Sequence, residues 1–131
     1  MFSHVMVGTS DLERSIEFYN ALFAAIGGSE PMRNTSPSGT ERVFYMFNGG
    51  MFGIAEPIDR GPATFANGGT IGFACNSAEQ VKAFHDAGVA AGGISIEDPP
   101  GRRDMDGLPP MDLCYLRDPD GNKLCGLHMI E

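Results

Sequence analysis

The sequence predicts an α+β domain made of two copies of one module, and an internal repeat is the main reason. Residues 4–21 read HVMVGTSDLERSIEFYNA, and a related segment, TIGFACNSAEQVKAFHDA, follows sixty-six positions later at 70–87. In each copy a short apolar run precedes a polar residue with a glutamate three positions after it. That order is typical of a strand leading into a capped helix. A unit written twice in one chain indicates modules that bury their core together.

The chain is expected to form one domain, 1–131, because this length is enough for a single hydrophobic core. Between the repeats, residues 58–67 contain glycine, proline, aspartate and asparagine with little periodicity. We therefore expect a linker there, joining a first module, 1–57, to a second module, 68–131.

Each module is expected to run strand, helix, strand, strand, strand. In the first module, Ser10 is the expected helix cap, and Gly27 and Gly28 end the helix. Before the last strand, Asn48, Gly49 and Gly50 favour a tight hairpin. The apolar stripe of that helix comprises Leu12, Ile16, Tyr19, Phe23 and Ile26. The expected strands are 2–8, a short edge strand within 30–40, 42–47 and 51–56.

The second module is expected to repeat this order, with Asn76 as the helix cap and Gly92 and Gly93 at the helix end. Residues 98–110 form a long loop rich in proline and glycine, and loops of this length are often functional. The expected strands are 70–74, 94–97, 111–117 and 122–130.

The amino-acid composition indicates which classes of binding partner are disfavoured. Nine lysines and arginines against 17 aspartates and glutamates give a formal net charge of −8, which disfavours nucleic acid and anionic membrane surfaces. No apolar run is long enough to cross a membrane. Cys75, Cys114 and Cys125 lack the paired spacing of a disulfide framework or zinc site, so the expected location is the cytoplasm.

Two segments carry a family resemblance. HVMVGTSDLERSIEFY resembles the opening strand and helix, and YLRDPDGNKL the closing hairpin, of the vicinal oxygen chelate superfamily, which includes glyoxalase I, bleomycin- and fosfomycin-resistance proteins and extradiol dioxygenases. The resemblance covers nearly the whole chain. It implies tandem βαβββ modules that form an open, barrel-like mixed sheet around a cavity. It also implies that the protein binds a small molecule and forms a homodimer. It leaves open whether modules pair within one chain or between two.

In metal-using members, His or Glu side chains from four strands hold a divalent ion. At those four positions, as the resemblance aligns them, this chain has a usual ligand only at His4. Thr70 and Cys125 occupy two of the other positions, and the fourth falls near Ile54. This depleted set favours no resident metal. The alternative is a divalent ion (Zn, Ni, Mn, Fe or Mg) held by His4, Glu56 and a shifted third ligand.

Further site candidates come from residue chemistry. His4 and Cys125 are the catalytic candidates, since an imidazolium beside a thiol lowers the thiol pKa; the alternative is a pocket histidine and a buried thiol. Arg102 is placed to bind an anion, and Tyr45 and Tyr115 are expected at matching places in the two modules, suited to an aromatic ligand. The predicted ligand-binding residues are Tyr45, Met46, Thr70, Tyr115 and Arg102.

Three functional hypotheses follow. The first is a glyoxalase-like protein with a small-molecule cavity and degenerate metal ligands. The second is a non-catalytic protein that sequesters a small, antibiotic-type molecule. The third is a metal-dependent lyase or dioxygenase that uses His4 and Glu56. A metal-independent enzyme with a Cys125 thiolate is a further variant, and whether the protein is an enzyme stays open at this point.

Overall fold

The computed structural model describes residues 1–28 and 30–130. The first half of the chain has the expected order of elements, and the second half has that order with one additional short strand, β7 (Gly101–Arg103). The first module contains β1 (Val5–Gly8), α1 (Leu12–Ala24), β2 (Met32–Thr35), β3 (Glu41–Phe47) and β4 (Gly50–Ala55). The second contains β5 (Ile71–Ala74), α2 (Ala78–Ala90), β6 (Ile94–Ser95), β7 (Gly101–Arg103), β8 (Met111–Arg117) and β9 (Lys123–Met129). The predicted module ranges also include Ser29 and Glu131, which lie outside the described residues.

Two separate mixed sheets confirm the predicted α+β class. The first has the order β1-β4-β3-β2, and the second has the order β5-β9-β8-β6 with β7 also paired to β8. The strands β1 and β4 pair in parallel, as do β5 and β9, and all the other strand pairs are antiparallel. Within the described residues no strand of one sheet pairs with a strand of the other, so the barrel is open.

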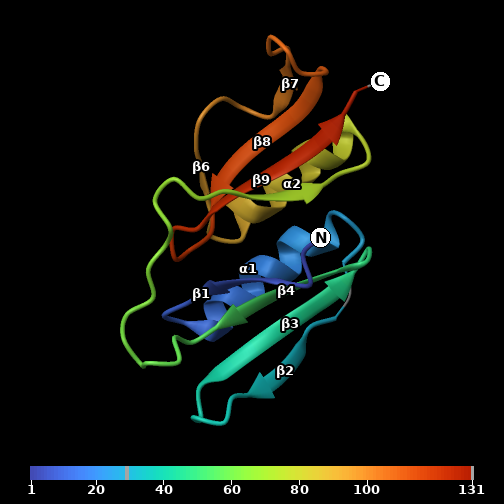
Figure 1. The fold of residues 1–131 in the computed structure, drawn as a ribbon. Coiled ribbons are helices and arrows are strands. Elements are labelled where there is room, and N and C mark those ends of the chain that lie inside the picture. Colours follow the sequence, from blue (N-terminus) through green and yellow to red (C-terminus); the bar gives the residue numbers. More distant parts are fainter. Residues whose placement is uncertain (29, 131) are drawn as a thin grey trace.

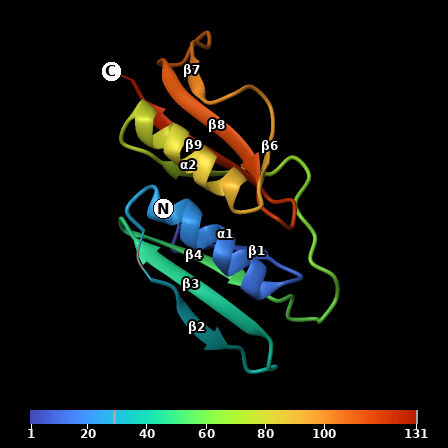
Figure 2. The same cartoon turned by 180° about the vertical axis from the view of Figure 1, so that it is seen from behind.

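Both helices lie on the same side of the two sheets (Figure 1), and the view from behind shows α1 and α2 side by side (Figure 2). Gly88 of α2 permits this close approach. A Cβ atom there would collide with a methyl group of Leu116 and lie 2.9 Å from one of Leu22. The opposite side of each sheet therefore carries no helix. Within the described residues, neither helix has the length and apolar character needed to cross a membrane.

The helix caps differ by one residue from those predicted. Asp11 caps α1 and Ser77 caps α2, each accepting a hydrogen bond from the backbone N–H three residues later. Ser10 and Asn76 therefore lie just outside the helices. Ser10 is engaged instead by the second module, because its backbone N–H donates to Asp120.

The turn between β8 and β9 joins the modules through the carboxylate of Asp120, which is only 6% exposed. It accepts hydrogen bonds from Thr9 Oγ1 (2.7 Å), Ser15 Oγ (3.1 Å) and the Ser10 N–H (2.9 Å), and it pairs with Arg14 Nη2 at 3.0 Å. Burial alone would raise the pKa of this carboxyl, but the hydrogen bonds outweigh burial and hold the pKa below its usual value.

A second aspartate of the same turn contacts the core of the first module. Tyr19 of α1 donates its hydroxyl to Asp118 Oδ2 at 2.6 Å, and Asp118 also accepts from the Asn122 side-chain amide. Burial, followed by the nearby Asp118 charge, raises the pKa of Tyr19 well above its usual value. The carboxylates of Asp118 and Asp120 thus hold the second module to the first, and we call this pair the inter-module latch. Both carboxylates have a structural role through these hydrogen bonds.

Candidate functional site

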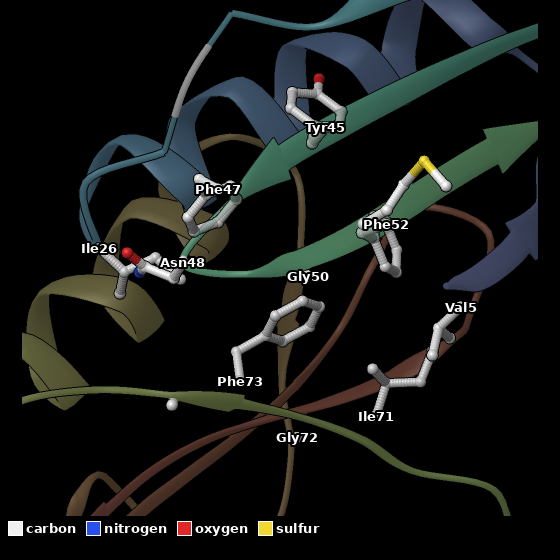
Figure 3. Close-up of a pocket in the computed structure, with 12 residues that line it drawn as sticks. Val5, Ile26, Tyr45, Phe47, Asn48, Gly50, Phe52, Ile71, Gly72 and Phe73 are labelled. Carbon is white, nitrogen blue, oxygen red and sulfur yellow. The ribbon is translucent and has the colours of Figure 1, made fainter. Parts of the chain in front are cut away.

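A cavity of about 230 Å³ lies between the modules, bounded by β4 on one side and β5 on the other (Figure 3). We call it the inter-module cavity. None of its lining residues carries a charge, and most are apolar. They are Val5, Ile26, Tyr45, Phe47, Asn48, Gly50, Met51, Phe52, Ile71, Gly72, Phe73 and Ala74.

Aromatic rings form the walls. Phe52 of β4 and Phe73 of β5 project toward each other from opposite sides of the cavity (Figure 3), with ring centroids 5.5 Å apart. Behind them Phe23 of α1 contacts both rings, and it lies 5.2 Å from the ring of Phe47. Because strand residues alternate in direction, Phe47 and Phe52 share the helix-facing side of the first sheet. The walls are therefore held by the buried core.

Two polar side chains lie among the lining residues, and they differ in their hydrogen bonding. The Tyr45 hydroxyl points away from the cavity in Figure 3 and donates to Asn20 Oδ1 at 2.7 Å; burial raises its pKa. Asn48, in the turn between β3 and β4, is exposed, and its φ of 52° lies in the left-handed region. Its carboxamide has no hydrogen-bond partner among the described residues. Among the described lining residues, Asn48 is thus the one with a polar side chain available to a ligand.

The predicted metal ligands lie elsewhere. His4 is exposed, with Nδ1 2.8 Å from Ser3 Oγ, and Glu56 accepts a hydrogen bond from the Glu41 N–H at 2.6 Å. Glu56 lines a separate polar cavity together with Arg42. In the part of the chain that the structure describes, no three His, Cys, Asp or Glu side chains gather closely enough to hold a metal ion. The donors of one chain therefore do not fit a resident metal, and the His4–Glu56 set stays a prediction.

The strand register defines the fourth ligand position, which was predicted only as lying near Ile54. Met6 pairs with Gly53, and its repeat counterpart Gly72 pairs with Cys125, so Gly53 is the counterpart of Cys125. The neighbouring Ile54 is fully buried and points to the opposite face. A Cβ atom at Gly53 would lie 2.8 Å from Met6 Cε, so the methionine already fills the space of a side chain.

Cys125 belongs to a second apolar cluster on the face of β8 and β9 that carries no helix. Burial raises the pKa of its thiol, although a hydrogen bond with Tyr115 acts in the other direction. The neutral thiol is therefore the favoured form near pH 7. The cluster comprises Met111, Leu113, Tyr115, Cys125 and Leu127.

Of the five residues predicted to bind ligand, only Tyr45 lines the inter-module cavity. Tyr45 pairs with Phe52 and Tyr115 pairs with Cys125, which places the two tyrosines on different faces of their sheets. The prediction that they occupy matching places is therefore wrong. Met46 follows Tyr45 on β3 and is 48% exposed on the opposite face.

Thr70 and Arg102 complete that predicted set. Thr70 lines a different pocket, beside Lys123 at the edge of β5. Arg102 lies on β7, a short strand within the segment expected to be a loop, and its guanidinium donates to both carboxylate oxygens of Asp104 at 3.1–3.2 Å. Its contacts are thus local. Sequence reasoning missed Asn48, Phe52 and Phe73, although aromatic residues at helix-facing strand positions were an available signal.

Comparison with known proteins identifies the wider group. A family model described as the Glyoxalase/Bleomycin resistance protein/Dioxygenase superfamily matches residues 1–125. The chain is 52% identical to a glyoxalase/bleomycin resistance protein from Albidiferax ferrireducens T118, over 99% of each chain and with a TM-score of 0.88. No match was found among curated proteins.

More distant structures share the fold alone. A glyoxalase-related enzyme from Fulvimarina pelagi is 22% identical, over 97% of this chain and 86% of its own, with a TM-score of 0.70. A mutant of the fosfomycin resistance protein FosX from Listeria monocytogenes, complexed with Mn(II) and a dihydroxypropylphosphonic acid, is 16% identical over 99% of this chain and 93% of its own, with a TM-score of 0.68.

Proposed function

Because the chain belongs to the Glyoxalase/Bleomycin resistance protein/Dioxygenase superfamily, we propose that it binds a small, uncharged organic molecule in the inter-module cavity. The observation that carries this proposal is the cavity itself, which has apolar walls contributed by both modules and no charged lining residue. An apolar cavity of about 150 Å³ in another protein binds benzene. The present cavity, at about 230 Å³, has room for one or two aromatic rings.

We propose that this binding is non-catalytic and needs no metal held by the side chains of one chain. The described lining residues include no carboxylate, imidazole, thiol or amine, and the one phenol, Tyr45, donates its hydroxyl to Asn20 and points away from the cavity. They therefore offer a ligand no general acid, general base or nucleophile. The lining also has no cation to pair with an anion such as the phosphonate named for the Listeria protein. These features support sequestration of a neutral compound, and the bound compound should be recovered unchanged.

A homodimer is the expected assembly, and we propose that it covers the sheet faces that carry no helix. Methionines of both modules are exposed on these faces, among them Met6 at 38% and Met129 at 45%. Exposed apolar patches commonly mark protein interfaces. Light scattering after size-exclusion chromatography should give twice the chain mass of 14.0 kDa; a monomeric mass would contradict this part of the proposal. Three free cysteines support a cytoplasmic location.

Two glycine substitutions test the site. A Cβ atom at Gly50 would meet nothing within 4 Å, and Gly50 pairs with Phe47, so Gly50→Leu should place its side chain inside the cavity. Gly72 has equal space but pairs with Cys125, so Gly72→Leu should add the same atoms on the other face. Gly72→Leu is therefore the matched control.

Binding of naphthalene to chelator-treated protein would be followed by its fluorescence. We expect Gly50→Leu to weaken binding at least about tenfold, because the added side chain occupies the space of the ligand, and Gly72→Leu to change it less than about twofold. Equal affinity of the wild type and Gly50→Leu, or binding that requires a metal ion, would overturn the proposal. A changed compound after incubation would overturn its non-catalytic part.

A further inference from the structure

The polar lining of the inter-module cavity narrows the class of ligand. Resting on the proposed function, we infer that the ligand is a neutral aromatic compound of one or two rings with a single hydrogen-bonding substituent, such as a phenol or an aryl carbonyl, that meets the carboxamide of Asn48. The rings occupy the inter-module cavity against the contacting rings of Phe52 and Phe73, and the substituent lies at the turn between β3 and β4.

The aromatic part of the inference follows from the walls. Rings of Phe47, Phe52 and Phe73 line the cavity, and their neighbours hold them in tilted or edge-on packing. A flat ring placed against these walls makes the edge-to-face and offset contacts that aromatic pairs prefer. The volume of about 230 Å³ excludes ligands much larger than two rings.

The hydrogen-bonding substituent of the ligand is inferred from a difference between the two polar lining residues: one already has a hydrogen-bond partner and the other has none among the described residues. Tyr45 already donates its hydroxyl to Asn20 and points away from the cavity. The carboxamide of Asn48 has both a donor and an acceptor and no partner among the described residues. It lies at the same end of the cavity as Ile26 in Figure 3, away from Val5 and Ile71. A ligand substituent of either kind can therefore pair with it at that end.

The ligand is inferred to be uncharged because the cavity lining has no charged side chain among the described residues. An ionised ligand group would therefore lose hydration there without gaining a counter-charge from those residues. A separate cavity has the charged side chains of Arg42, Glu56 and Asp59 among its lining residues. The contrast assigns uncharged aromatic compounds to the inter-module cavity.

The test uses three probes and one variant of the full chain. The probes are naphthalene, 2-naphthol and 2-naphthalenesulfonate. The variant is Asn48→Gly, because glycine accepts the left-handed φ of 52° and the substitution removes the carboxamide together with its single methylene group. Its urea midpoint would first be compared with that of the wild type, and Gly50→Leu serves as the blocked-cavity reference.

We expect Asn48→Gly to weaken 2-naphthol binding roughly threefold to tenfold, the effect of losing one neutral hydrogen bond, and to leave naphthalene within about twofold. We expect the sulfonate to bind at least about tenfold more weakly than 2-naphthol. Equal losses for naphthalene and 2-naphthol in Asn48→Gly would overturn this inference while leaving the proposed function intact. Tight sulfonate binding would overturn the neutral-ligand part of both the inference and the proposed function. If Gly50→Leu binds naphthalene as well as the wild type does, the proposed function itself fails.

Discussion

Replacing Asp120 with alanine should lower the free energy of unfolding by about 3 kcal/mol. The carboxylate is 6% exposed and accepts from Thr9, Ser10 and Ser15 across the module boundary. A hydrogen bond to a charged group contributes about 1.5–3 kcal/mol, and neighbouring bonds are not additive. The ion pair adds little, because Arg14 is 44% exposed.

Urea unfolding followed by circular dichroism measures this loss. Asp104→Ala is the matched control, because Asp104 is 68% exposed and pairs only locally, with Arg102; its expected effect is below about 0.5 kcal/mol. If Asp120→Ala is no less stable than Asp104→Ala, the inter-module latch does not stabilise the fold as argued.

The same carboxylate predicts a pH dependence. Since the folded state holds the pKa of Asp120 below its usual value of about 4, its contribution is present above that value and is lost as the pH falls through the lowered pKa. Asp120→Asn should therefore be less stable than the wild type near pH 7 and lose less stability below about pH 4. Parallel stability curves for the two proteins in acid would refute this reasoning.

Three further predictions concern the core, the thiols and the metal. Gly88→Ala should lower the free energy of unfolding by about 2 kcal/mol in urea, although alanine favours helices, because the added methyl group has no space; a stabilised variant would contradict the packing. Burial raises the pKa of Cys75 to about 11 and of Cys114 to about 12, and also raises that of Cys125, so iodoacetamide should label the thiols slowly in native protein and fast in urea. Rapid native labelling of Cys125 would instead support the thiolate enzyme. Elemental analysis should find well under one equivalent of transition metal in both wild type and His4→Ala, whereas about one equivalent that His4→Ala loses would favour the metal-dependent lyase or dioxygenase.

Most of the fold could be predicted because local signals agreed with the repeat. The strand and helix of each repeat, the hairpin at Gly49 and Gly50 and the closing turn all depend on short-range chemistry. The caps were misplaced by one residue because Ser10 and Asp11 are both good capping residues, and the contact of Ser10 with Asp120 spans the chain. The strand β7 was missed because its pairing with β8 is a tertiary contact.

The site was harder to predict because the strand register decides which face of the sheet each side chain occupies, and the packing of the modules decides where a cavity remains. A shift of one residue between Gly53 and Ile54 moves a side chain from one face of the sheet to the other, and the same effect separates Tyr45 from Tyr115. The inter-module cavity arises where the two packed modules leave space between β4 and β5. No local pattern in a strand encodes such a space, so Asn48 was predicted only as a turn residue.

A crystal structure of the protein with 2-naphthol, grown in the presence of a chelator, tests the central claim most directly. The rings should lie in the inter-module cavity against Phe52 and Phe73, with the hydroxyl group within hydrogen-bond distance of the Asn48 carboxamide. A naphthol ring on the opposite sheet face beside Cys125, or an empty inter-module cavity at saturating 2-naphthol, would contradict the claim.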